Sequence, residues 1–275
     1  MHIYILVIVI ILTLLYLILI MPRIRKKPDI SGLMGRHYAH RGLHKGRDIP
    51  ENSMPAFKLA VEEGYGIEFD VHLTKDQVPV VFHDDNLKRL CGIDKNINDL
   101  SYEEVKNLNL YDTKETIPHL QDVLDLVDGR VPLIIEIKAS KAFDKEKLIS
   151  RIVSTYLDKY KGIYCVESFN PLVLLWFKQN RPNLVRGQLA THKTFKNTDF
   201  TNRFFNFALR NLLFNAFTKP DFIAYNYEYS HLFTYNLCRR LYKPLTVAYT
   251  IQTQDNLEKI RDRFDLIIFD EFIPQ

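Results

Sequence analysis

The strongest constraint on the fold is a regular alternation of strand-like and helix-like segments that begins near residue 37. Short runs of β-branched, aromatic and aliphatic residues have the composition of strands, and longer amphipathic runs separate them. The strand-like runs are 37–41, 66–72, 78–83, 132–138, 163–168, 184–189, 222–226, 245–251 and 265–269. Residues 75–77 (Lys-Asp-Gln) form a turn between the second and third runs, which predicts a β-hairpin.

When the return strand of the hairpin is set aside, eight strand-like runs remain. Eight parallel strands that alternate with helices form a closed barrel, and about 250 residues is a typical length for that fold. We therefore predict an α/β protein, a (β/α)8 TIM barrel with a small β-hairpin insertion after strand 2. An open, doubly wound sheet is the alternative. The helices are expected near 54–63, with Asn52 or Ser53 as N-cap, and near 101–108, 120–127, 144–160 and 171–179.

Charged residues interrupt three of the strand-like runs. Glu68 and Asp70 are two positions apart and therefore project from the same face of a strand, as do Glu136 and Lys138. The pair at 40–41 (His-Arg) ends the first run. Buried strands are normally apolar, so charges in them need ion-pair, metal or catalytic partners. A barrel brings such partners together at the C-terminal ends of its strands, whereas an open sheet gives no comparable reason for them to converge.

The spacing of Glu68 and Asp70 indicates a metal site. Two carboxylates this close repel each other unless a cation or a shared proton lies between them. A hard divalent ion with oxygen ligands is the natural partner.

Several short motifs occur in a fixed order along the chain. They are His-Arg-Gly at 40–42, Pro-Glu-Asn at 50–52, Glu-Phe-Asp at 68–70, Thr-Lys-Asp at 74–76, His-Asp at 83–84 and Glu-Ile-Lys at 136–138. In order and spacing this set resembles the glycerophosphodiester phosphodiesterases, a family of phospholipase C-like TIM barrels. The resemblance runs from about His37 to the C-terminus. The chain departs from the family pattern at Tyr249, where a tryptophan is common, and at Gln252, where an asparagine or aspartate is more usual.

The resemblance implies metal-assisted hydrolysis of a phosphodiester. Glu68, Asp70 and Glu136 would hold one divalent cation, Ca²⁺ or Mg²⁺, because three carboxylates suit these ions better than Zn²⁺. Arg41 and Lys138 would bind the substrate phosphate, Arg41 as a bidentate fork and Lys138 as a point charge.

His40 and His83 would serve as general acid and base, since imidazole titrates near neutrality. The sequence leaves open which histidine has which role. Glu51 and Asn52 are assigned to local positioning. No site role is assigned to the remaining histidines of this region, His37, His44 and His72.

The function implied by the resemblance is hydrolysis of glycerophosphodiesters to glycerol 3-phosphate and an alcohol. A lysophospholipase D-type phosphodiesterase that acts on membrane lysophospholipids is one alternative. A non-catalytic barrel that binds phospholipid headgroups is the other, although the presence of every acid, base and metal position of the motif set argues against it.

The N-terminus contains an unbroken apolar run from Ile3 to Ile20. At 1.5 Å per residue, a helix of this length covers roughly 27 Å, which is enough to cross a bilayer. A cleaved signal peptide would have a basic start, a shorter apolar core and a small-residue cleavage site, and none of these is evident. We therefore predict an uncleaved transmembrane anchor at 1–21, a basic linker at 22–36 and the barrel domain at 37–275.

Basic residues follow this apolar run, while only Met1 and His2 precede it. The positive-inside rule therefore predicts a single-pass protein of the cell membrane with its barrel on the cytoplasmic side. The basic residues would also contact anionic headgroups. They are Arg23, Arg25, Lys26, Lys27 and Arg36.

Residues 195–217 are unusually rich in phenylalanine, and basic residues far outnumber acidic ones around them. Two interpretations stay open. The segment is either a buried helical hairpin that covers the barrel or an interfacial element that inserts aromatic side chains into lipid. An interfacial element would turn the mouth of the barrel toward the bilayer.

Composition excludes some other classes. The net charge of +4 is modest and no nucleic-acid-binding motif occurs, so no nucleic-acid partner is expected. The cysteines Cys91, Cys165 and Cys238 form no Cys-x-x-Cys pair, which suits a reducing compartment where thiols act as small packing residues.

Overall fold

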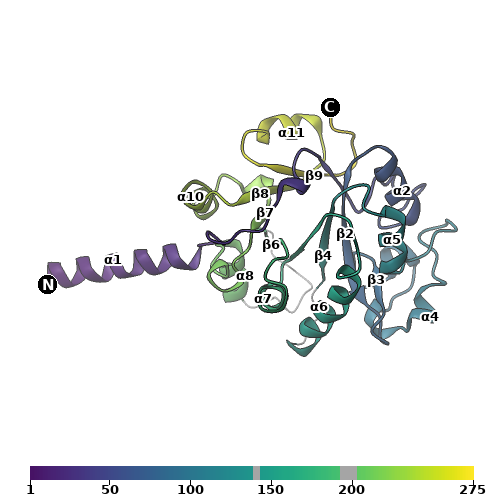
Figure 1. Ribbon diagram of the computed structural model, residues 1–275, viewed down its shortest axis with the longest axis horizontal. Coiled ribbons are helices and arrows are strands. Elements are labelled where there is room, and N and C mark those ends of the chain that lie inside the picture. The colour runs from purple at the N-terminus through teal and green to yellow at the C-terminus, as the bar shows by residue number, and fades with distance from the viewer. Residues whose placement is uncertain (139–142, 193–202) are drawn as a thin grey trace.

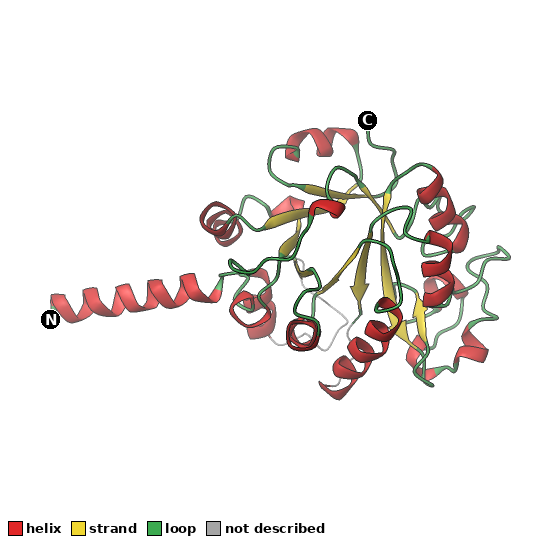
Figure 2. Ribbon diagram, viewed as in Figure 1, coloured by secondary structure: helices red, strands yellow, loops and turns green. Residues whose placement is uncertain are grey.

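Strands and helices alternate along the chain as the sequence pattern predicts. In the computed structural model, which describes residues 1–138, 143–192 and 203–275, eight parallel strands close into a barrel (Figures 1 and 2). The first strand pairs with both the second and the last, and this double pairing closes the sheet. The (β/α)8 prediction is therefore confirmed. The barrel strands are β1 (Tyr38–His40), β2 (Gly66–Leu73), β4 (Leu133–Ile137), β5 (Tyr164–Ser168), β6 (Arg186–Ala190), β7 (Phe222–Asn226), β8 (Leu245–Ile251) and β9 (Leu266–Phe269).

The predicted hairpin follows β2. Strand β3 (Pro79–Val81) runs antiparallel to it, with Val71 opposite Val81. Thr74 closes the turn, because its hydroxyl donates to Asp76 Oδ1 (2.6 Å) and accepts from the Val78 N–H (3.0 Å). These bonds explain the Thr-Lys-Asp motif locally.

The insertion is larger than a hairpin. Residues 84–119 continue through α3 (Lys88–Cys91), a 3₁₀ turn (Ile97–Asp99) and α4 (Tyr102–Val105), which is shorter than the helix predicted at 101–108. Apolar residues from these turns and from β3 form a separate hydrophobic cluster. Their spacing along the sequence is irregular, so periodicity gave no sign that they pack together. The cluster is Val80, Phe82, Leu87, Leu90, Ile97, Leu100, Val105, Leu110 and Ile117.

Helices surround the barrel as a ring (Figure 2). They are α2 (Met54–Glu62), α5 (Leu120–Val127), α6 (Phe143–Leu157), α7 (Pro171–Asn180), α8 (Arg203–Arg210), α9 (Asn215–Thr218), α10 (Phe233–Tyr242) and α11 (Gln254–Ile260). The helices predicted at 54–63, 120–127, 144–160 and 171–179 are confirmed to within three residues at each end. Ser53 caps α2, because its hydroxyl accepts from the Ala56 N–H (3.4 Å).

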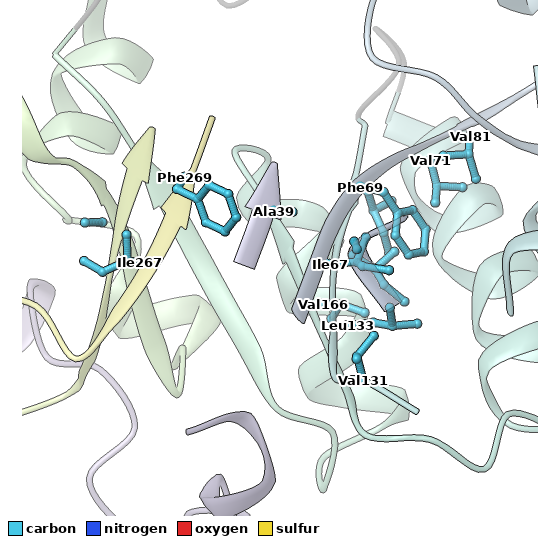
Figure 3. Packing of buried hydrophobic residues seen from close by; sticks show 14 of the residues in the cluster. Ala39, Ile67, Phe69, Val71, Val81, Val131, Leu133, Val166, Ile267 and Phe269 are labelled. Atoms are coloured by element: carbon cyan, nitrogen blue, oxygen red, sulfur yellow. The ribbon is translucent and has the colours of Figure 1, made fainter. Parts of the chain in front are cut away.

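Strand β2 separates the hydrophobic core from the site. Ile67, Phe69 and Val71 project to one side and pack in the cluster that includes Phe57 of α2 and Val123 of α5 (Figure 3). Glu68 and Asp70 alternate with them and therefore project into the barrel.

A second apolar cluster fills the lower part of the barrel interior, nearer the N-terminal ends of the strands. Tyr38, Ile134 and Cys165 belong to it. Two positions further along these strands are His40, Glu136 and Glu167, which point to the same side as the apolar residues below them. The interior is thus apolar at one end and charged at the other. Cys165 is a buried packing residue, as predicted.

Helix α1 (His2–Leu19) projects outward from the ring between α8 and α10 (Figure 1). Within the part of the chain that the structure describes, α1 is the one helix long and apolar enough to cross a membrane. Its mean hydropathy is 2.9 and no residue of its span is buried.

The phenylalanine-rich segment is described from residue 203 onward. Helix α8 buries Ala208 and Leu209 and leaves Phe207 exposed, while α9 leaves Phe217 exposed. The described part of the segment is thus helical and partly buried, as the first interpretation expects, and contact of its exposed phenylalanines with lipid stays a prediction. Residues 195–202 lie outside the described residues.

We predict that Gly187→Ala destabilises the barrel. A Cβ atom at Gly187 would lie 2.0 Å from Cε2 of Phe222 on the neighbouring strand. Overpacking of this kind costs about 1–3 kcal/mol in the free energy of unfolding, which urea denaturation of the detergent-solubilised chain measures. Phe222→Leu in the Gly187→Ala background should recover part of the loss. Equal stability of wild type and Gly187→Ala would contradict the packing described.

Candidate active site

A cluster of carboxylates lies inside the barrel at the C-terminal ends of β2 and β4. Each of Glu68, Asp70 and Glu136 is buried and offers one oxygen, and these atoms all lie within 4.8 Å of one another. The register explains the convergence, because β2 and β4 are parallel neighbours with Asp70 directly opposite Glu136. The cluster is an oxygen-only group that can bind a metal ion.

Lys138 compensates part of this negative charge. Its Nζ lies 2.8 Å from Asp70 Oδ1 and 2.8 Å from Glu136 Oε2. Burial by itself raises the pKa of Asp70, but the charges of Lys138, His83 and Arg41 outweigh it and hold that pKa well below its usual range.

The other carboxylates of the cluster are compensated less well. Burial, opposed by Lys138 and reinforced by Asp70, raises the pKa of Glu136 to about 7. Burial and the charge of Asp70 raise the pKa of Glu68 well above normal. Without a bound cation, the cluster therefore retains protons near neutral pH.

The His-Arg-Gly motif turns the chain sharply at the end of β1. Arg41 and Gly42 both adopt left-handed backbone conformations, with φ of 58° and 80°. Glycine is required at 42, because a Cβ there would lie 2.9 Å from the backbone of Ala56 in α2. The turn directs the Arg41 side chain back over the carboxylates, where Nε lies 3.6 Å from Asp70 Oδ2.

His40 is held by a carboxylate that the sequence analysis missed. Its Nδ1 lies 2.9 Å from Oδ2 of Asp270, the residue directly after β9. An ionised carboxylate only accepts, so Nδ1 carries the proton and Nε2 keeps its lone pair. Nε2 faces the cluster, 3.9 Å from Glu68 Oε2. Burial and Arg41 lower the pKa of His40, while Asp270 opposes them.

His83 is likewise oriented by a carboxylate. Its Nδ1 lies 2.6 Å from Oδ1 of Asp84, and Arg89 Nε donates to Oδ2 of that carboxylate (2.7 Å). Burial and the charge of Lys138 lower the pKa of His83 to about 4.

Glu51 connects the two sides of the site. It accepts two hydrogen bonds from Arg89 (2.6 and 2.8 Å) and one from Arg41 Nη1 (2.7 Å). Asn52 donates to Asp70 Oδ2 (3.0 Å). Glu51 and Asn52 of the Pro-Glu-Asn motif thus position charged neighbours.

An open pocket lies over this cluster. His40, Arg41, Glu68, His83, Glu136 and Lys138 line its charged side. Phe169, Leu189 and Tyr249 contribute an apolar side, and the Tyr249 hydroxyl donates to the Ala190 carbonyl (2.8 Å). The lining of the pocket thus combines charged groups with apolar side chains.

The structure brings together all seven residues that the sequence singles out. Of the histidines given no role, His37 lies at the opposite end of β1, and His72 Nε2 contacts the His83 carbonyl (3.1 Å). His44, by contrast, lies at the site, with Nε2 2.7 Å from Asp270 Oδ1.

Besides His44, three further residues of the site were missed. Asp270 and Glu167 were both detectable, because each lies at the C-terminal end of a predicted strand, where barrel sites form. Glu167 is buried, lines the pocket and is paired in register with Glu136. Arg89 lies in the insertion, and nothing in its local sequence sets it apart.

We predict that Asp270→Asn lowers the pKa of His40 further. The Asp270 carboxylate stabilises the imidazolium, so its removal favours the neutral ring. Ring ¹⁵N chemical shifts followed against pH measure the change. Asp262→Asn, which removes an exposed surface carboxylate, is the matched control and should leave the titration unaltered. An unchanged pKa in Asp270→Asn would show that this contact does not act on His40.

Comparison with known proteins identifies a family for most of the barrel. The model of the glycerophosphoryl diester phosphodiesterase family matches residues 40–264. A glycerophosphodiester phosphodiesterase from Caldanaerobacter subterraneus is 36% identical over 162 residues, which cover 55% of this chain and 65% of that protein. A lysophospholipase D from Rattus norvegicus is 41% identical over 106 residues, 38% of this chain and 32% of that protein. The chain thus spans less than two thirds of either relative.

Solved structures agree on the fold. A phosphodiesterase from Oleispira antarctica, determined in complex with the product sn-glycerol-3-phosphate, superposes with a TM-score of 0.71 over 87% of this chain and 94% of its own. Its sequence identity is 22%, so the likeness concerns the fold. The family match extends from His40 at the end of β1 to Phe264 before β9 and includes every motif described above. This chain therefore belongs to the glycerophosphoryl diester phosphodiesterase family.

Proposed function

We propose that this protein hydrolyses glycerophosphodiesters to glycerol 3-phosphate and an alcohol. The observation that carries the proposal is the buried carboxylate cluster of Glu68, Asp70 and Glu136, with His40 and His83 in the lining of the same pocket. The family match supports the same chemistry.

The cluster fits one divalent cation, Ca²⁺ or Mg²⁺. Its donor set consists of carboxylate oxygens without nitrogen or sulfur, which suits these hard ions. The raised pKa values of Glu68 and Glu136 point to the same need for positive charge. A bound ion supplies Lewis-acid stabilisation of the phosphate charge.

The chain's own cations bind the phosphate. Lys138 and Arg41 both line the pocket beside the carboxylates, and Glu51 fixes the guanidinium from behind. The two positive groups would offset the charge that builds up on the phosphoryl oxygens as the new P–O bond forms and the bond to the alcohol oxygen breaks.

His40 and His83 move the protons. Each Nδ1 donates to a carboxylate, Asp270 or Asp84, which leaves each Nε2 able to exchange a proton with the substrate. One histidine takes a proton from the attacking water as its oxygen bonds to phosphorus, and the other delivers a proton to the departing alcohol oxygen as its bond to phosphorus breaks. The paired carboxylate stabilises the imidazolium that forms in each case.

A lysophospholipase D-type activity on membrane lysophospholipids is the second candidate. The apolar side of the pocket and the exposed apolar helix α1 favour it, because together they suit a substrate with an acyl chain. Similarity to the rat lysophospholipase D is in keeping with it. Relative turnover of glycerophosphocholine and lysophosphatidylcholine by the full chain distinguishes the two. A barrel that only binds headgroups is disfavoured, since such a role needs no paired histidines.

We also propose that residues 1–21 anchor the protein in the cell membrane, that 22–36 form a basic linker and that the barrel domain 37–275 lies on the cytoplasmic side. Support comes from the exposed apolar surface of α1 and from the basic residues that follow it. Protease accessibility in sealed vesicles tests the orientation.

We predict that His40→Ala and His83→Ala each lower kcat by about 10²-fold or more, the usual effect of losing a general acid or base. Release of glycerol 3-phosphate from glycerophosphocholine measures it. His37→Ala, at the other end of β1, is the matched control and should retain activity. Near-normal kcat in either site variant would remove that histidine from the mechanism.

We predict that EDTA abolishes turnover and that Ca²⁺ or Mg²⁺ restores it. Glu136→Gln should weaken ion binding in calorimetric titrations. Lys138→Ala should mainly raise KM, since it removes a phosphate contact and leaves the three carboxylates in place. Full activity of a chelated preparation, or unchanged ion affinity in Glu136→Gln, would contradict the assignment.

Ion binding should also depend on pH. The pKa of Glu136 is raised to about 7, so below that pH an ion must displace a proton from it. Affinity should therefore fall as pH decreases from 8 to 6, with proton release detectable as a buffer-dependent binding enthalpy.

A further inference from the structure

Helix α1 is fixed to the barrel rather than tethered to it. The Tyr16 hydroxyl lies 2.7 Å from Thr234 Oγ1 at the start of α10, and the Tyr242 hydroxyl at its end donates to the Leu17 carbonyl (2.8 Å). Asn215 of α9 donates to the carbonyl of Ile20 (2.9 Å), which is completely buried. The last turn of α1 is thus held between α9 and α10.

The contact continues beyond the helix. Lys219 Nζ donates to the Met21 carbonyl (3.1 Å). Arg23 pairs its backbone N–H with the Pro220 carbonyl (3.0 Å) and its guanidinium with Asp221 (3.4 Å). Residues 16–23 therefore form a rigid joint, and the barrel follows the direction of α1.

The length of α1 brings the barrel close to the bilayer. Residues 2–15 are fully outside the barrel and cover roughly 21 Å at 1.5 Å per residue. The hydrocarbon core of a bilayer is about 30 Å thick. If α1 spans it, the joint lies at or within the near edge of the hydrocarbon, and the barrel surface around the joint meets the headgroups.

That surface has the composition of a membrane contact. In the described residues outside 1–21, nine large hydrophobic side chains are exposed, and five of them lie on α8, α9 and α10 around the joint. We call these five side chains the collar. They are Phe204 (70% exposed), Phe207 (46%), Phe217 (58%), Phe233 (72%) and Leu241 (51%).

Basic residues predominate in the helices that carry the collar. The stretches 203–220 and 231–243 contain no aspartate or glutamate. Arg203, Arg210, Arg240 and Lys243 lie among the apolar residues, and the basic linker follows the joint directly. Aromatic residues surrounded by basic ones suit the interface of an anionic bilayer.

We propose that the collar is a docking surface for an anionic lipid bilayer and that it holds the barrel on its side against the membrane. The proposal rests on the proposed anchoring by α1. Helix α1 leaves the ring of helices sideways (Figure 1). If α1 stands across the bilayer, the barrel axis therefore lies along the membrane, and the catalytic pocket opens parallel to the membrane surface. A mouth turned toward the bilayer, as expected from the sequence, does not fit this arrangement. Substrates would enter from the headgroup layer.

Tryptophan fluorescence tests the collar in the full chain. The protein has a single tryptophan, Trp176, so Trp176→Phe gives a silent background. In that background, Phe207→Trp, Phe217→Trp and Phe233→Trp are made one at a time. Ile273→Trp is the matched control, because Ile273 is also exposed (54%) but lies near the C-terminus, away from α1 (Figure 1). Each variant is reconstituted into phosphatidylcholine–phosphatidylglycerol vesicles with brominated acyl chains.

We expect the three collar tryptophans to lose most of their emission to the brominated lipid and to shift to shorter wavelength, with the control unaffected. Quenching no stronger than at position 273 would overturn the proposal. So would a blue shift that appears only as the protein-to-lipid ratio rises, since that outcome identifies a second protein copy as the occupant.

Extraction at alkaline pH distinguishes failure of the docking proposal from failure of the proposed anchoring by α1. A chain that stays with floated vesicles but shows no collar quenching retains its anchor and lacks the docking surface. A chain that is extracted has no spanning α1, and both proposals then fail. Hydrolysis of glycerophosphocholine in detergent should be equal in all variants, because none of these residues touches the pocket.

Discussion

The concentration of buried negative charge at one end of the barrel is the constraint on which the rest of the structure depends. Glu68, Asp70, Glu136 and Glu167 are all buried inside the barrel, where water solvates them poorly. Charge in such a place persists only with partners. Lys138 lies between two of the carboxylates, and Arg41 reaches them from a strained left-handed turn. The surrounding motifs largely hold the side chains of Lys138 and Arg41 in position.

Much of the fold could be predicted because its signals are local. Alternation along β2 separates Ile67 and Phe69, which face the helices, from Glu68 and Asp70, which face the interior. The Ser53 cap and the Thr74 turn are likewise fixed by neighbours in sequence. The seven predicted site residues converge for a related reason, since the ends of parallel barrel strands necessarily meet.

The rest depends on contacts between residues far apart in sequence. Asp270 is 230 residues from His40, and Arg89 is 38 residues from Glu51. The position of Asp270 after a strand marks it as a candidate, but in both cases only closure of the barrel reveals the partner. The joint between α1 and the barrel is of the same kind, because Tyr16 meets Thr234 across 218 residues. Hydropathy identified α1 as apolar but contained no information on what its last turn packs against.

The insertion has its own apolar cluster and can therefore unfold at a lower temperature than the barrel. Asp84 and Arg89 belong to residues 84–119, which pack mainly among themselves and contribute little to the main core. Segments of this kind open as independent cooperative units, at a lower free energy than the whole domain. Opening of this unit would release the partners of His83 and Glu51 while the barrel strands stay paired. Catalytic competence would then be lost in a reversible, sub-global transition at temperatures below the one that melts the barrel.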